Sequence, residues 1–193
     1  MDSPKTKLEL LRAMEIGRRE WDTVLSQIDG QHLSEPGVEG VWSVKQIIAH
    51  VAGYEEWTTA FLTDRLNPGA GILAAHDAFW QEQLDVYRQD HPDFPSQMNE
   101  TDDDQTNAVV VAVYDQYTAR EVLEREQQAY HRLLSAIQAT LESQLIEPGI
   151  VGKKSIMEIL PDQAHGHYQG HLPAIQRWWA QHGNKSNDGK LPE

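Results

Sequence analysis

The sequence predicts an all-α protein, a four-helix bundle in an up-down-down-up arrangement. Apolar residues recur with the helical period in four long segments. Three of these segments open on a capping box. In this motif two residues three positions apart each accept, with their side chains, a hydrogen bond from the backbone N–H of the other. A long crossover separates the second helix from the third and lets the two run in the same direction, whereas a short link would make them antiparallel.

Length and composition predict one folded domain. The chain has 193 residues, of which 39% are hydrophobic, and six Trp and six Tyr supply bulky packing groups. A chain of this length can bury a sizeable core. We expect a single bundle domain over residues 1–183, interrupted by an acidic crossover at 67–107 and followed by a flexible tail at 184–193.

The first two helices are predicted from their caps and their apolar stripes. Ser3-Pro4 suits the N-cap and first position of a helix that would run for about 25 residues, to Asp29-Gly30. The capping box Ser43-Val-Lys-Gln46 should open the second helix, which would end near Leu66. The inward stripe of this second helix reads Ile47, His50 or Val51, Tyr54, Trp57 and Phe61.

The connection between the second and third helices carries most of the acidity. Residues 67–107 hold nine Asp and Glu against Arg88 alone, which gives −8 of the net charge of −14. The first half of this connection, which contains Trp80 and Leu84, has a helical pattern. The second half, NETDDDQTN, is predicted to be an exposed loop, and a short helix over NAVVVAVYDQY should follow it.

The last two helices open on the remaining capping boxes. Thr118-Ala-Arg-Glu121 should begin a third helix that reaches about Leu145, and Ser155-Ile-Met-Glu158 should begin a fourth. We expect the fourth helix to run to Gly183, which suits the position after a helix end. Pro173 lacks an N–H and should bend this helix.

The net charge and the lack of cysteine argue against several classes of protein. Sixteen Lys and Arg against 30 Asp and Glu should repel duplex DNA and anionic membranes, so we expect no nucleic-acid and no membrane partner. No apolar run approaches the ~18 residues needed to span a bilayer, and the first residues lack a secretory signal core. We therefore expect a cytoplasmic protein. Zero Cys excludes a disulfide scaffold and a thiolate nucleophile.

Two histidines in the stretch HGHYQGH, residues 165–171, are predicted to share a helical face. His167 and His171 are spaced i and i+4. This face continues to Ile175 and Trp178, so the pair is predicted to lie on the inward stripe of the fourth helix. His50 is predicted to face inward from the second helix.

Three imidazoles facing one bundle interior favour a metal site. An unpaired buried polar group costs ~1–3 kcal/mol, and a divalent ion offsets this cost by accepting one nitrogen from each ring. The sequence therefore predicts a divalent metal site at His50, His167 and His171, with an open position for water or substrate. The alternative, that each is a hydrogen-bonded core histidine, remains open.

The other polar residues near these histidines are weaker candidates. His165 is predicted to point outward. Glu55 and Asp162 are candidate bases or acceptors for the ligands, against the more frequent alternative of a solvated surface carboxylate; no catalytic residue is assigned. A zincin protease is excluded because Tyr168 stands where the His-Glu-x-x-His motif needs its glutamate.

Two stretches resemble the signatures of the DinB/YfiT-like superfamily. They are Trp42-Ser-Val-Lys-Gln-Ile-Ile-Ala-His50-Val and His167-Tyr-Gln-Gly-His171-Leu-Pro-Ala-Ile175. The opening residues and the long crossover are most similar to the ClbS/DfsB-type branch, although the acidic insertion departs from it. The resemblance implies a bundle, often dimeric, whose three matching histidines hold a divalent ion such as nickel or zinc. It also implies thiol-dependent transferase or isomerase chemistry, or the opening of a strained ring in a genotoxin.

The leading functional hypothesis is a metal-dependent transferase or hydrolase. The ion would activate water or a low-molecular-weight thiol for attack on a small electrophilic substrate. Tyr54, Trp57 and Trp42 are expected to line the mouth of the site. The alternative is a non-catalytic protein that sequesters a small molecule or a metal, and a third hypothesis is a bundle that binds a partner through its acidic crossover.

Overall fold

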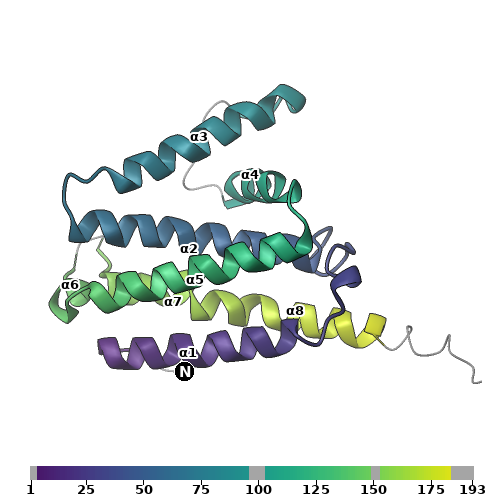
Figure 1. Cartoon of the computed structure of the whole chain (residues 1–193). Helices are drawn as coiled ribbons and strands as arrows, with labels where there is room; N and C mark the ends of the chain where they lie inside the picture. The colour runs from purple at the N-terminus through teal and green to yellow at the C-terminus, as the bar shows by residue number, and fades with distance from the viewer. Residues whose placement is uncertain (1–3, 96–102, 149–152, 184–193) are drawn as a thin grey trace, which may run out of the picture. The chain divides into compact units, whose positions relative to one another are not determined.

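The computed structural model describes residues 4–95, 103–148 and 153–183. Within these ranges the chain forms helices joined by turns and contains no strand, so the predicted all-α class is confirmed (Figure 1). The four-helix bundle and its up-down-down-up order stay predictions. None of the described helices is long and apolar enough to cross a bilayer.

The chain divides into two compact units. Unit 1 comprises residues 1–47 and 145–193, and unit 2 comprises residues 48–144. The boundary falls inside one helix, between Ile47 and Ile48. The predicted flexible tail, 184–193, lies outside the described residues.

The first helix of unit 1, α1 (Lys7–Leu25), is shorter than predicted at both ends. Thr6 is its N-cap, and the Thr6 hydroxyl accepts a hydrogen bond from the Glu9 N–H at 3.2 Å, so the predicted first helical position at Pro4 is wrong. Ser3, the predicted cap, lies outside the described residues. It ends well before Asp29-Gly30, and a single turn of 3-10 helix, η1 (Gly30–His32), follows. Its buried stripe is Leu10, Met14, Gly17, Arg18, Trp21, Val24 and Leu25.

The predicted fourth helix is broken into α7 (Ile156–Gln163) and α8 (His165–His182). The capping box between Ser155 and Glu158 opens α7 as predicted. The break falls at Ala164, whose φ of −135° and ψ of −111° are not helical. Pro161 lies inside α7 and lacks the N–H that would bond to the carbonyl four residues earlier, which weakens the end of this helix. Gly166 lies so close to the Pro161 carbonyl that a Cβ would come within 2.5 Å of its oxygen.

Helix α8 packs on α1 and α7 in unit 1 (Figure 1). The rings of Trp21 and Tyr168 stack with their centroids 5.2 Å apart, and both side chains are fully buried. Helix α8 ends at His182 and Gly183 is its C-cap, as the sequence predicts.

Unit 2 contains most of α2 (Val44–Leu66) together with α3 (Ile72–Asp90), α4 (Asp103–Asp115), α5 (Ala119–Ala139) and the start of α6 (Glu142–Ile146). The capping box at Thr118 opens α5, and the box at Ser43 precedes α2, as predicted. The third predicted helix ends at Ala139 rather than near Leu145, and α6 follows after a break.

The acidic crossover is more helical than predicted. Its first half forms α3, as expected, and buries Trp80 and Leu84. In its second half, residues 96–102 lie outside the described ranges, and the chain is helical from Asp103 rather than from Asn107. The predicted loop is therefore wrong over residues 103–106, because acidic residues are favourable in a first helical turn.

A group of charged and aromatic side chains joins three helices of unit 2. Glu56 of α2 pairs with Arg132 of α5 at 3.2 Å and accepts a hydrogen bond from Tyr114 of α4. Burial raises the pKa of Glu56, a rise that the charge of Arg132 opposes. Burial also raises the pKa of Tyr114, and the neighbouring Glu56 carboxylate adds to this rise.

Candidate metal-binding histidines

His167 and His171 lie on consecutive turns of α8. Their ring centroids are 5.1 Å apart, at an interplanar angle of 36°. Both side chains are half-buried. The predicted sharing of one helical face is therefore confirmed, and the two imidazoles are close enough to contact the same ligand.

The face of α8 that carries the pair continues to Ile175 and Trp178, which are buried as predicted, and the two histidines are themselves half-buried. The residues buried around this helix include Tyr168, Leu172 and Ile175. Tyr168 stacks on Trp21 of α1. The half-burial of the two histidines is compatible with access from solvent, which a reactive site needs.

His171 has a carboxylate partner that the sequence does not suggest. Its Nδ1 lies 2.9 Å from Oε2 of Glu39, with side-chain exposures of 14% and 31% respectively. A carboxylate on the far nitrogen of an imidazole orients the ring and raises the basicity of the other nitrogen. Histidines that bind metals commonly have such a partner.

A tight turn holds Glu39 in place. The Trp42 N–H donates to the Glu39 carbonyl at 3.0 Å, and the N–H groups of Gly37 and Val38 both donate to the Trp42 carbonyl. Gly40 has a φ of +60°, a conformation that glycine adopts without strain. Three backbone hydrogen bonds therefore fix the backbone from which the Glu39 side chain extends.

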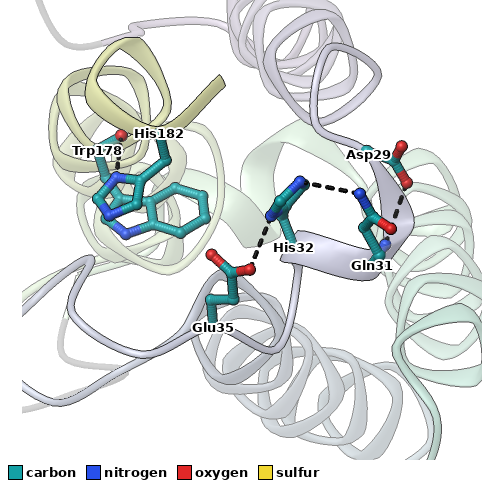
Figure 2. Close-up of polar contacts among 6 residues, drawn as sticks. All are labelled: Asp29, Gln31, His32, Glu35, Trp178 and His182. Carbon is teal, nitrogen blue, oxygen red and sulfur yellow. Dashed lines mark hydrogen bonds and ion pairs between the residues drawn. The ribbon is translucent and has the colours of Figure 1, made fainter. Parts of the chain in front are cut away.

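The segment leading to this turn is anchored on α8. The His32 ring lies against the Trp179 ring, with centroids 5.6 Å apart. Figure 2 shows the contact of His32 Nδ1 with Glu35, at 2.8 Å. The other ring nitrogen of His32 bonds to the Gln31 amide at 3.1 Å. Further along, Leu33 is buried and its carbonyl accepts from the Lys45 N–H at 2.7 Å.

His182 lies near the C-terminal end of the same helix, α8. Its ring stacks on Trp178 with centroids 4.7 Å apart, and its Nδ1 bonds to the Trp178 carbonyl at 2.8 Å (Figure 2). These contacts give His182 a packing role.

His50, the third predicted ligand, lies in α2 and belongs to unit 2. Its side chain is buried, which agrees with the inward position predicted for it. The ring of Tyr54 meets it edge to face at 4.8 Å. Tyr54 therefore packs against a predicted ligand, as expected for a residue lining the site.

His165 is buried, so the prediction that it points outward is wrong. It lies against Gly17 of α1. The prediction assumed one continuous helix, whereas the break at Ala164 places His165 at the start of α8. Burial lowers the pKa of His165, and the nearby charge of Asp162 opposes this shift.

The two carboxylates suggested by sequence differ in burial. Glu55 is fully buried in α2, so a solvated surface position is wrong for it. Asp162 is exposed, as the alternative of a solvated surface carboxylate predicts. Glu39 was missed because it lies in a turn, outside any helical stripe, and 132 positions before His171. The glycines at 37 and 40 were the only local signal of a fixed turn there.

The chain matches no known family model and no curated protein in sequence. Solved structures nevertheless share its fold. The colibactin self-resistance protein ClbS, in complex with a dsDNA, is 14% identical, with a TM-score of 0.69 over 90% of this chain and 95% of ClbS. An uncharacterised protein from Escherichia coli UTI89 is 14% identical, with a TM-score of 0.67 over 99% of both chains.

A protein from Streptococcus pneumoniae is 12% identical, with a TM-score of 0.60 over 92% of both chains. At these identities the likeness shows the fold alone. The chain therefore has a ClbS-like all-helical fold, as the resemblance in its sequence implies. Membership of the DinB/YfiT-like superfamily, dimerisation and metal dependence stay predictions.

The exclusion of nucleic acid as a partner is wrong, because a protein of this fold, ClbS, occurs in complex with a dsDNA. The exclusion rested on the charge of the whole chain, which is unevenly distributed. Unit 2 has 5 Lys and Arg against 17 Asp and Glu, a net charge of −12, whereas unit 1 has 11 against 13, a net charge of −2. The total therefore does not describe the nearly neutral unit 1.

Proposed function

We propose that this protein is a metal-dependent enzyme in which His50, His167 and His171 hold one divalent ion. The observation that carries the proposal is the pair of half-buried imidazoles on consecutive turns of α8, with ring centroids 5.1 Å apart. His50 adds a buried third imidazole that packs against Tyr54.

The donor set suits such an ion. Imidazole nitrogens bind zinc, nickel, copper and iron. Among these we propose nickel or zinc as the ion. The contact between Glu39 and His171 adds the carboxylate partner that ligating histidines commonly have. Three protein ligands leave room for a further ligand, as in reactive rather than purely structural sites.

The proposed reaction is the attack of water or a low-molecular-weight thiol on a small electrophile, as a transferase or a hydrolase. When bound, the ion supplies Lewis acidity and makes a nucleophile available at neutral pH. In this scheme the chain itself orients the site: Glu39 accepts a hydrogen bond from the Nδ1–H of His171, and Tyr54 packs against the ring of His50.

Turnover of model electrophiles tests this proposal. Protein loaded with zinc or nickel is incubated with an epoxide or an aryl chloride and excess cysteine or glutathione, and loss of free thiol is followed with time. A parallel reaction without thiol follows hydrolysis. We expect many turnovers per protein and loss of this activity in His50→Ala. Stoichiometric consumption would instead support the alternative of a sequestering protein, and no consumption would contradict both.

A second candidate function is binding to duplex DNA. It is favoured by the ClbS complex with dsDNA, and the charge distribution directs it to unit 1, net −2, rather than to unit 2, net −12. Fluorescence anisotropy of a labelled duplex at 50 and 200 mM salt tests it. Binding that weakens with salt supports this function, whereas unchanged anisotropy at 50 mM salt contradicts it.

A further inference from the structure

The contact between Glu39 and His171 specifies which nitrogen of the imidazole carries the proton. An ionised carboxylate can only accept hydrogen bonds. At 2.9 Å from Oε2 of Glu39, Nδ1 of His171 must therefore be the donor. In a neutral ring, Nε2 then has no proton and a lone pair available for a ligand.

We infer that Glu39 is a positioning residue that holds His171 as its Nδ1–H tautomer and so presents Nε2 to the metal ion. This inference rests on the proposed function. It assigns a role to a residue of the turn between η1 and α2, and it predicts that the backbone of this turn helps to set metal affinity.

The rigidity of the turn supports this role. Three backbone hydrogen bonds connect Gly37, Val38 and Glu39 with Trp42, at 2.8 to 3.1 Å. The Glu39 side chain therefore extends from a fixed backbone, so only side-chain freedom is lost when it meets His171. A flexible loop would pay more conformational entropy for the same contact.

The same unit contains a natural control. Glu35 contacts Nδ1 of His32 at 2.8 Å, a geometry close to that of Glu39 and His171. In this second pair the Gln31 amide occupies the other nitrogen of the ring (Figure 2). His32 is outside the proposed ligand set. Removal of Glu35 should therefore change the tautomer of His32 and leave metal binding unchanged.

Two measurements test the inference. Long-range ¹H–¹⁵N correlation spectra of the metal-free protein at pH 8, where a histidine of ordinary pKa is neutral, report the tautomer of each ring. We expect His171 to carry its proton on Nδ1 in the wild type and to shift toward the Nε2–H form in Glu39→Ala. Glu35→Ala should move the His32 signals alone.

Zinc affinity, measured by competition with a chelator, is the second readout. We expect a loss of about 10–100-fold in Glu39→Ala, a smaller loss in Glu39→Gln, which keeps an acceptor oxygen without the charge, and none in Glu35→Ala. An unchanged His171 tautomer or an unchanged zinc affinity in Glu39→Ala overturns the inference. Absence of zinc binding by the wild type contradicts the proposed function instead, and the spectra still decide whether Glu39 sets the tautomer.

Discussion

Two glycines one turn apart on α8 should respond in opposite ways to the same substitution. At Gly166 an added Cβ would lie 2.5 Å from the Pro161 carbonyl oxygen and 3.2 Å from its carbon. At Gly170 an added Cβ would meet nothing within 4 Å. Both positions have ordinary negative φ, so backbone conformation does not distinguish them.

The expected free energies follow from these contacts. Gly→Ala in an open helical position raises the free energy of unfolding by about 0.5–1 kcal/mol, so Gly170→Ala should be more stable than the wild type. Overpacking costs about 1–3 kcal/mol, and at Gly166 the obstructing atom is backbone, which cannot move aside like a side chain. We expect Gly166→Ala to be less stable than the wild type by about 1–2 kcal/mol after the helical gain is subtracted.

Urea unfolding of the metal-free proteins, followed by circular dichroism, measures this difference. The two variants should be separated by about 2–3 kcal/mol, with similar dependence on urea if both unfold in the same way. A Gly166→Ala variant as stable as Gly170→Ala would refute the close approach of Gly166 to Pro161, and with it our explanation of the break between α7 and α8.

Three further predictions concern the two units. Trp21→Ala should lower the free energy of unfolding by about 3–5 kcal/mol, because it removes the fully buried ring that stacks on Tyr168; urea unfolding measures this, and a loss below 1 kcal/mol would contradict it. Gly40→Ala should weaken zinc binding in a chelator competition, because an L-residue is strained at a φ of +60° and the turn holds Glu39; unchanged affinity would contradict it. Burial raises the pKa of Glu56 above 4.5, so the folded state retains a proton that the unfolded state releases, and stability should fall as pH rises from 4.5 through that raised value. Urea unfolding at pH 4 and pH 7 should show this fall relative to Glu56→Gln, and an equal pH dependence in both proteins would contradict it.

Features set by neighbouring residues could be predicted from the sequence. The capping boxes at Ser43, Thr118 and Ser155 all form, because each depends on two residues three positions apart. The pairing of His167 with His171 is equally local and follows from the helical period. The all-α class follows because the period recurs along the whole chain.

Features set by contacts between distant segments could not be predicted. The partner of His171 is Glu39, which lies in a turn far away in the chain, and no periodic pattern identifies it. His165 is buried rather than exposed because the backbone breaks at Ala164, whereas a continuous helix would have directed it elsewhere. Glu55 is likewise fully buried. Its burial depends on packing against residues distant in the sequence, and its neighbours in the chain do not indicate it.

The central claim is tested most directly by the zinc affinity of four single variants compared with the wild type. We predict one zinc ion per chain in the wild type. Removal of a hydrogen-bond partner of a ligand lowers metal affinity by about 10–100-fold. The zinc affinity should fall by more than this in each of His50→Ala, His167→Ala and His171→Ala. His131→Ala, which changes an exposed histidine of α5, should bind like the wild type. Wild-type zinc affinity in any one of the first three variants would contradict the account.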